Sequence, residues 1–156
     1  MNKIFYTLLL AAAPISELRG AIPYAISQGL SWQSAYFWGV VGNMIPVFFI
    51  LWLLDPVSKW LSKNFKIFDK FFKWLFHYTR TKHASKIEKY QELALIVLVA
   101  IPLPMTGAWT GSLVAFLFGL PYKKALPLIF LGVLIAGAIV TLVSMGALNI
   151  GIFVKH

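Results

Sequence analysis

Residues 14–23 read PISELRGAIP and place two prolines, a glycine and two charged residues inside an otherwise apolar segment. Residues 3–13 before this stretch and residues 24–30 after it are apolar, so the sequence predicts a helix that is broken in the middle. In a bilayer, the backbone groups freed at such a break need protein or water as partners. We therefore expect the break to face the protein interior rather than lipid. A continuous apolar segment follows at residues 33–54.

The same pattern recurs further along the chain. Residues 93–101 are apolar, residues 102–111 (PLPMTGAWTG) form a second break, residues 112–119 continue the helix, and residues 125–150 make a second long apolar segment. Duplicated broken helices are typical of transporters built from internal repeats. A shift of 90 positions aligns identical residues, including glycines and a proline at the breaks and turns: Leu8 with Leu98, Pro14 with Pro104, Ala25 with Ala115, Gly29 with Gly119, Leu30 with Leu120, Ala35 with Ala125, Gly42 with Gly132, and Ile45 with Ile135.

The composition is that of an integral membrane protein. Of 156 residues, 60% are hydrophobic and 12% are charged. Three charge-free stretches (20–54, 93–122 and 125–154) exceed the roughly 20 residues that span a bilayer. The absence of cysteine excludes disulfides and thiolate metal sites, and the three scattered histidines do not form a zinc-binding pattern. We expect no cofactor, no bound metal and no nucleic-acid partner.

Residues 55–90 join the two copies and carry most of the charge. Between residues 57 and 76, aromatic and aliphatic side chains recur on one helical face and lysines on the other. This pattern predicts an amphipathic helix in the membrane interface, and a water-exposed linker helix is the alternative. Residues 77–90 are more polar and are expected to bend back toward the bilayer. The lysines expected to face anionic lipid headgroups are Lys59, Lys63, Lys66, Lys70 and Lys73.

The distribution of positive charge favours broken segments that enter the bilayer and return over broken segments that cross it. If both return, the 55–92 loop shares one side with Lys123 and Lys124, and only Lys3 and Lys155 lie opposite. If both cross, Lys123 and Lys124 move away from the loop, against the tendency of positive charge to remain in the cytoplasm. The sequence therefore predicts a cytoplasmic 55–92 loop.

These arguments predict an all-α integral membrane fold that forms a single domain over residues 1–156. It contains two inverted repeats, residues 3–54 and 93–150, each a re-entrant helical hairpin followed by a transmembrane helix. The amphipathic interfacial helix within residues 55–90 joins them. The repeats are inverted because one full span separates the hairpins, so the two breaks meet near the midplane. Small residues in the last span predict close packing within the chain or in a homodimer.

Glu17 and Arg19 are the ionisable residues inside the apolar parts of the two copies, and burial of either alone is costly. One interpretation makes Glu17 a protonatable gate and Arg19 a ligand for an anion or headgroup. In the other, Arg19 clamps carbonyls freed by the break, with Glu17 as its counter-ion. Asp55 precedes Pro56 at the end of a span and is expected to cap the interfacial helix. The remaining candidate binding residues are polar side chains near the breaks, Thr106, Trp109, Thr110, Ser112 and Asn43, and the residues expected to form the breaks are Pro14, Gly20, Pro23, Pro102, Pro104, Gly107 and Gly111.

The motifs Pro14-Ile15-Ser16-Glu17, Arg19-Gly20-Ala21-Ile22-Pro23 and Pro102-Leu103-Pro104-Met105-Thr106-Gly107 resemble the small multi-drug export protein family of prokaryotic membrane proteins. The first motif is also similar to the proline-flanked acidic motif of the DedA (VTT-type) family. That similarity implies inverted re-entrant hairpins and proton-dependent transport, with lipid carriers among the substrates. This chain has Ala100 and Gly107 where DedA proteins carry arginines around the second break.

The sequence therefore predicts a small transporter in the cell membrane of a prokaryote, coupled to protons through Glu17, with a small-molecule or lipid substrate. A lipid flippase or scramblase is the alternative within transport. A membrane-shaping or partner protein that uses the 57–76 helix is the alternative from another class. An enzyme is disfavoured, because the apolar segments contain no nucleophile–base pair and no metal-ligand cluster.

Overall fold

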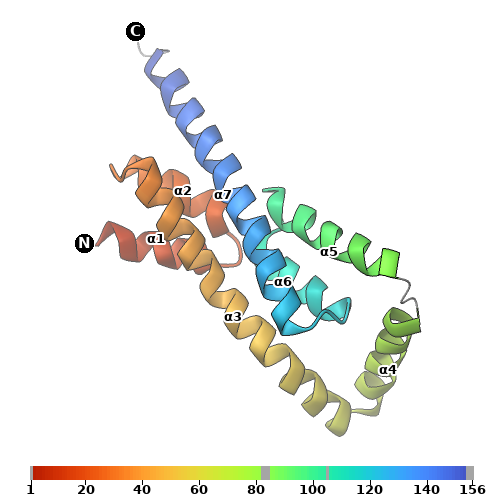
Figure 1. Cartoon of the computed structure of the whole chain (residues 1–156). Coiled ribbons are helices and arrows are strands. Elements are labelled where there is room, and N and C mark those ends of the chain that lie inside the picture. Colours follow the sequence, from red (N-terminus) through yellow and green to blue (C-terminus); the bar gives the residue numbers. More distant parts are fainter. Residues whose placement is uncertain (1, 82–84, 105, 154–156) are drawn as a thin grey trace.

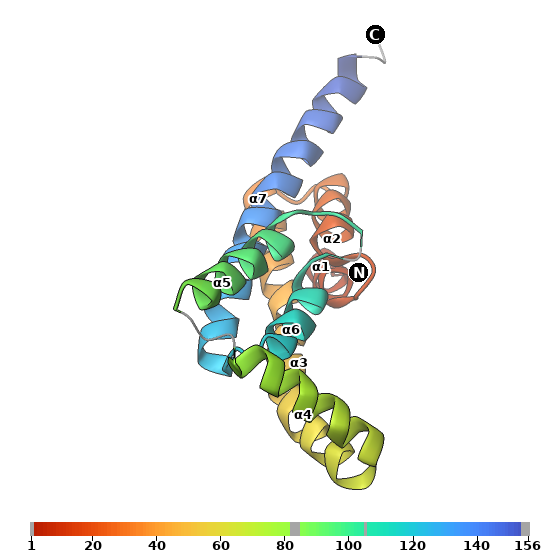
Figure 2. The same cartoon turned by 90° about the vertical axis from the view of Figure 1, so that its right-hand side faces the viewer.

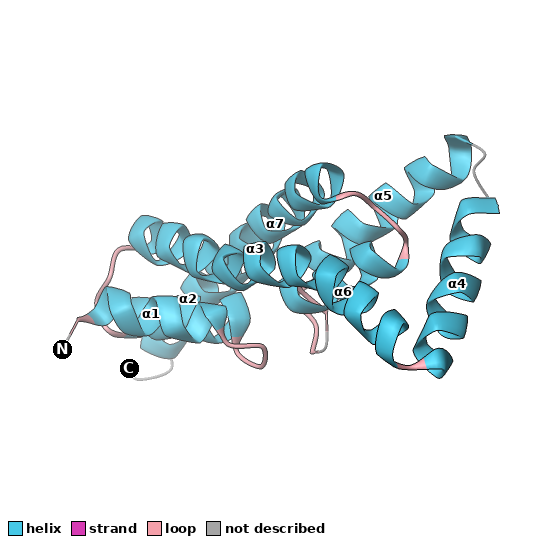
Figure 3. Cartoon of the chain, turned by 90° about the horizontal axis from the view of Figure 1, so that it is seen from below, coloured by secondary structure: helices cyan, strands magenta, loops and turns pink. Residues whose placement is uncertain are grey.

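The computed structural model describes residues 2–81, 85–104 and 106–153. Within these residues the chain forms helices and no strands, which confirms the all-helical prediction (Figure 1 and Figure 3). Residues 82–84 in the expected polar bend, Met105 in the second break, and Lys155 lie outside the described residues. The helices are α1 (Lys3–Ala12), α2 (Glu17–Ser27), α3 (Trp32–Asn64), α4 (Lys66–Thr81), α5 (Ser85–Ala100), α6 (Ala108–Leu117) and α7 (Tyr122–Phe153).

Helices α1 and α2 form a hairpin around the first break. The side chain of Asn2 caps α1 by accepting a hydrogen bond from the Ile4 backbone N–H at 3.3 Å. The first residue of α1, Lys3, contacts the end of the hairpin: its Nζ donates a hydrogen bond to the carbonyl oxygen of Gln28, just after α2. The hairpin thus returns to the end at which it starts (Figure 1).

Helices α5 and α6 form a second hairpin around residues 101–107. Glu92 on α5 accepts a hydrogen bond from the Lys124 Nζ at 3.5 Å, so the start of α7 is tied to the body of α5. Helix α5 begins at Ser85, earlier than the predicted residue 93, because polar residues of the connector extend it by two turns. In Figure 1, α1 and α2 lie to the left of α7, and α5 and α6 lie to its right.

Three residues that the sequence analysis assigned to the breaks lie inside helices. Gly20 and Pro23 belong to α2, and Gly111 belongs to α6. The two glycines permit close contact, since an added β-carbon would lie 2.7 Å from Ser16 Cβ at Gly20 and 2.3 Å from Val99 Cγ2 at Gly111. Pro23 fits because its fixed φ is close to the helical value and only one backbone N–H is lost. Pro14, Pro102, Pro104 and Gly107 remain outside the helices, as predicted.

The two hairpins end in the same hydrogen-bonded turn. The Leu30 N–H bonds to the Ala25 carbonyl at 3.1 Å, and the Leu120 N–H bonds to the Ala115 carbonyl at 3.0 Å. The residue before each of these donors is a glycine in the left-handed region, with φ of 81° at Gly29 and 69° at Gly119. Glycine is favoured at this helix-ending position because it has no β-carbon. The turns are separated by the 90 positions seen in the sequence.

Each long helix also crosses the first helix of its own hairpin at a glycine. At Gly42 on α3, an added β-carbon would lie 2.8 Å from both the Leu8 carbonyl oxygen and the Ala11 Cβ of α1. At Gly132 on α7, it would lie 2.6 Å from the Val99 Cβ of α5. Small residues allow helix backbones to approach this closely, as in membrane helix packing.

Helices α3 and α7 are both long and apolar enough to cross a membrane. Large apolar side chains are exposed along them, including Trp52 at 67% and Leu142 at 71% exposure. Such an exterior suits lipid rather than water. The core lies where the hairpins meet α3 and α7, and its largest fully buried side chains include Ile22, Leu95 and Ile129.

The predicted amphipathic helix over residues 57–76 is wrong in its boundaries. Helix α3 continues through Pro56 to Asn64, and the chain turns at Phe65 before α4 begins. Proline removes only its own N–H from the helix, and this part of α3 projects away from the hairpins (Figure 2). Asp55 therefore caps no helix. It lies within α3, where its carboxylate accepts a hydrogen bond from Lys59 at 2.8 Å.

Candidate functional site

The first break positions Glu17 as the starting residue of α2. Its side chain is buried, with 6% of the residue exposed, and its φ of 43° makes it the one non-glycine residue with positive φ in the described part of the chain. Non-glycine residues are strained in this region and persist there only when surrounding contacts hold them. The unusual backbone at Glu17 therefore points to a specific role for its carboxylate.

The Glu17 carboxylate lies against the N-terminus of α6 in the other hairpin. The Trp109 N–H donates to Glu17 Oε1 at 3.5 Å, and the Ala108 amide also acts on the carboxylate. Gly107, the residue before α6, has a φ of 137° and no side chain that could cap the helix. The first amides of a helix lack partners within that helix and favour negative charge. Glu17 thus serves as the N-terminal cap of α6 from a different hairpin.

Trp109 makes a second link between the hairpins. Its indole Nε1 donates a hydrogen bond to the Ala12 carbonyl oxygen at 3.0 Å. Ala12 is the last residue of α1, so this carbonyl is one that the first break leaves without a helical partner. The breaks are therefore joined by one contact in each direction: a carboxylate of the first reaches α6, and an indole of the second reaches α1.

Arg19 is half-buried on α2, two residues beyond Glu17. It acts on the Glu17 carboxylate electrostatically, but it forms no ion pair or hydrogen bond with any residue that the structure describes. The contacts required by the clamp interpretation are thus absent from the described residues. The carbonyl freed at Ala12 is satisfied by Trp109 instead.

The predicted hydroxyl residues of the second break bind locally. The Thr106 hydroxyl donates to the carbonyls of Ile101 at 2.7 Å and Leu103 at 2.9 Å, and it accepts from the Leu103 N–H at 3.1 Å. The fully buried Ser112 donates to the Ala108 carbonyl one turn earlier, at 2.7 Å. Thr110 is half-buried on α6. Thr106 therefore holds the shape of the break.

Asn43 is buried on α3, with 1% of the residue exposed. Its Oδ1 has no hydrogen-bond partner among the described residues. Unsatisfied buried polar atoms are rare in native proteins because their desolvation is not compensated. Asn43 follows Gly42, the point at which α3 crosses α1, so it lies close to the first hairpin.

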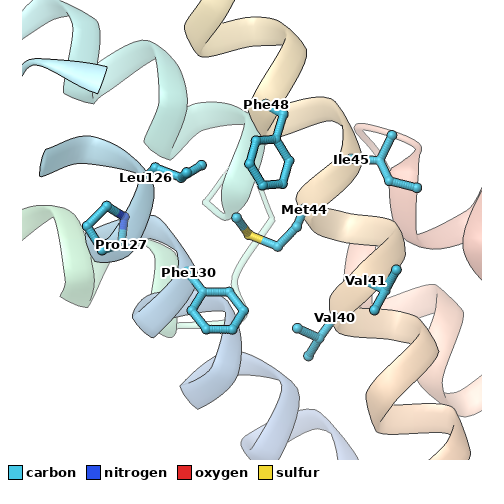
Figure 4. Close-up of a pocket in the computed structure, with 8 residues that line it drawn as sticks. All are labelled: Val40, Val41, Met44, Ile45, Phe48, Leu126, Pro127 and Phe130. Atoms are coloured by element: carbon cyan, nitrogen blue, oxygen red, sulfur yellow. The ribbon is translucent and has the colours of Figure 1, made fainter. Parts of the chain in front are cut away.

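Two apolar cavities lie between α3 and α7, away from Glu17. One, of about 470 Å³, is lined by residues of both helices, including Met44, Phe48 and Phe130 (Figure 4). The other, of about 400 Å³, is lined by Trp32, Tyr36 and residues near Thr141. Within the described residues, no group of three or more His, Cys, Asp or Glu side chains could hold a metal ion.

The predicted headgroup-binding lysines are divided between two helices. Lys59 and Lys63 lie on α3, and Lys66, Lys70 and Lys73 lie on α4. Lys59 pairs with Asp55 at 2.8 Å and Lys73 with Asp69 at 2.7 Å. Exposed pairs of this kind contribute little to stability and leave the face cationic.

An aromatic cluster accompanies these lysines. Trp60, Phe65, Phe68, Phe71 and Phe72 form a series of ring contacts with centroid separations of 5.7–6.4 Å. The ring of Phe72 also lies 6.1 Å from that of Phe116 on α6. The second hairpin therefore touches Glu17 at one end of α6 and the aromatic cluster at the other.

These features define the class of the protein: within the described residues it is all-helical, with two helices long and apolar enough to cross a membrane and two helical hairpins that meet at their breaks. The chain belongs to the family described as "Putative small multi-drug export protein", whose model matches residues 17–139. This confirms the family resemblance, while the similarity to DedA proteins stays a prediction. No curated protein and no solved structure matches the chain.

Proposed function

We propose that the chain is a small membrane transporter that exports small molecules by moving its two hairpins against each other. The description of its family names multi-drug export. Helices α3 and α7 are long and apolar enough to cross a bilayer and so to anchor the two hairpins in it. The contact of Glu17 with the first turn of α6 carries the proposal, because it joins the two breaks. Transporters commonly bind substrates where broken helices meet near the midplane.

The hairpins are proposed to be re-entrant and related as inverted repeats. Three observations support this: the helix-ending turns at Gly29 and Gly119, the close crossings at Gly42 and Gly132, and the return of the first hairpin to its starting end. Because α3 alone crosses the bilayer between them, the hairpins enter from opposite faces. The lysine-rich segment between α3 and α5 then lies in the cytoplasm, together with Lys123 and Lys124.

Glu17 is the proposed proton-sensitive gate between the hairpins. As a carboxylate it is attracted by the amides of Ala108 and Trp109, whereas a protonated carboxyl group loses most of that attraction. Protonation therefore weakens the contact that joins the breaks and favours their separation. The proton is the coupling ion in this scheme, and its release restores the closed contact.

Arg19 and Asn43 are the proposed substrate-binding groups. The Arg19 guanidinium forms no hydrogen bond or ion pair with a described residue. Asn43 Oδ1 is a buried acceptor that also has no partner among the described residues. The exposed aromatic cluster and the lysines of α3 and α4 are proposed to anchor this end of the protein at anionic headgroups. A role in membrane shaping by α4 is the second candidate, favoured by its exposed Phe68, Phe71 and Trp74 side chains.

Reconstitution tests the proposal. Vesicles that contain the purified protein are loaded with carboxyfluorescein, an anionic probe that suits the Arg19 guanidinium, and its release is followed with and without a pH gradient. We expect gradient-dependent release that is lost in Glu17→Gln and kept in Asp69→Asn, a carboxylate change on α4 outside the hairpins. A fluorescent phospholipid in the same vesicles tests the flippase alternative. Movement of the lipid alone would favour a flippase, and movement of neither probe would favour the membrane-shaping role.

A further inference from the structure

The cavity whose lining side chains are drawn in Figure 4 is a groove with a buried floor and an exposed rim. Its floor is made by Val40 and Met44, each 6% exposed, and its rim by Phe48, Ile45 and Phe130, which are 43–46% exposed. In this view the Met44 thioether lies between the rings of Phe48 and Phe130. A volume of about 470 Å³ is within the usual range for small-ligand sites, and every lining side chain is apolar.

The groove is closed at one end by a tight crossing of α3 and α7. An added β-carbon on Gly137 would lie 2.8 Å from Tyr36 Cε2 and 3.3 Å from Val40 Cγ2. The Tyr36 hydroxyl also donates to the Leu134 carbonyl at 3.1 Å. The groove therefore ends at this crossing, and a ligand can enter it across the exposed rim or from the start of α7.

A lysine lies at the open end. Lys123 precedes Leu126, Pro127 and Phe130 by three, four and seven residues, which places it on the same face of α7 as these lining residues. Lys123 forms no ion pair with any described residue, whereas its neighbour Lys124 is held by Glu92. On α3, the acidic residue on the same face as the lining residue Phe48 is Asp55, seven positions later, and Asp55 is paired with Lys59. The open end therefore carries a net positive charge.

The part of α7 between Lys123 and the crossing at Leu134 is about as long as one leaflet is thick. Leu134 lies eleven residues after Lys123, a distance of about 16 Å along a helix. Half of a hydrocarbon core of about 30 Å is about 15 Å. We propose that the groove between α3 and α7 binds an anionic phospholipid, with one acyl chain along Met44, Phe48 and Phe130 and its acidic headgroup at Lys123. This site is separate from the Glu17 contact and does not depend on transport.

Site-directed fluorescence quenching in lipid vesicles tests the proposal. The chain contains no cysteine, so Ile45→Cys on the groove rim and Leu131→Cys on the neighbouring, lipid-exposed face of α7 can each carry a single bimane label. The quenchers are phosphatidylglycerol and phosphatidylcholine that carry a nitroxide on the acyl chain. At position 45 we expect a preference for phosphatidylglycerol of about fivefold, the ratio that corresponds to about 1 kcal/mol for one lysine near the surface. At position 131 we expect no preference.

Two lysine variants distinguish a headgroup site from general surface charge. Lys123→Gln should remove the preference at position 45, and Lys124→Gln, which changes the same net charge by the same amount, should keep it. Equal quenching by the two lipids at position 45, a preference that survives in Lys123→Gln, or an equal preference at positions 45 and 131 would each overturn the proposal.

Discussion

The Glu17 carboxylate occupies the space that a side chain at Gly107 would fill. A β-carbon on Gly107 would lie 1.9 Å from Glu17 Oε2, although the two residues belong to different hairpins. The glycine backbone, with φ of 137°, and the positive φ of Glu17 both serve this approach. An acidic residue of the first break is thus matched to a glycine of the second.

Gly107→Ala is expected to disrupt the contact. The alanine side chain would collide with the carboxylate, and its backbone would be strained by about 1–3 kcal/mol at this φ. The melting temperature in detergent should fall strongly. Gly146→Ala is the matched control, because no atom lies within 4 Å of an added β-carbon there. Helix propensity makes that change neutral or stabilising by up to about 1 kcal/mol. Equal melting temperatures for the two variants would contradict the contact.

Glu17→Gln is expected to cost little stability. Its amide oxygen still accepts from the Trp109 N–H, and only the attraction of a charge to the helix N-terminus is lost, up to about 2 kcal/mol. Adding Arg19→Gln should restore nothing, because no ion pair joins the two side chains. Thermal melting of the single and double variants measures this. A loss of about 3–5 kcal/mol in the single variant that the double variant repairs would instead support the clamp.

The sequence predicted much of the fold because single residues mark where the helices end and where they are broken. Gly29 and Gly119 end helices by a backbone conformation that glycine favours, and Pro14 and Pro104 stand in breaks, so each could be recognised without knowledge of the rest of the chain. Gly20 and Gly111 were misassigned because a glycine needed for close packing has the same letter as a glycine needed for a turn. Only the packed neighbours distinguish the two uses: Val99 of α5 at Gly111, and Ser16, the residue before α2, at Gly20.

Two residues of the contact between the breaks could be singled out from the sequence, whereas their function as a site stays a prediction. Glu17 and Trp109 were identified because a charge and an indole inside apolar breaks are conspicuous, but their partners are backbone groups: the α6 amides and the Ala12 carbonyl. Backbone groups leave no signature in a sequence, so Arg19 was the natural candidate partner of Glu17. The helix end at Asn64 rather than Asp55 was missed because Pro56 is tolerated within α3.

Cysteine labelling tests the re-entrant topology. In this cysteine-free chain, Lys63→Cys and Lys123→Cys should react with a membrane-impermeant maleimide from one side, and Asn2→Cys and Ser31→Cys from the other. If both hairpins return to the side from which they start, the lysines around positions 63 and 123 lie together on one side. The tendency of positive charge to remain in the cytoplasm favours this arrangement. Labelling of positions 63 and 123 from opposite sides would exclude re-entrant hairpins.

The lysine face should bind anionic lipid in a peptide of residues 56–78. Replacement of Lys59, Lys63, Lys66, Lys70 and Lys73 by Gln should weaken binding to anionic vesicles and remove its dependence on salt. Exposed charges are screened over about 10 Å at 0.1 M salt, so salt should weaken the parent peptide only. Sedimentation with vesicles measures the binding. A parent peptide that ignores lipid charge would argue against headgroup anchoring.

The distance between the two breaks tests the central claim most directly. Spin labels at Ile15→Cys and Leu103→Cys, which are 87% and 54% exposed in the native chain, report this distance in vesicles without any substrate. Between about pH 8 and about pH 4, a range that extends below the ordinary Glu pKa of about 4.3, we expect the distribution to shift to longer distances. Glu17→Gln should give the acidic distribution at both pH values, and Asp69→Asn should respond like the parent chain. A distribution that is the same at both pH values in the parent chain would contradict the gate.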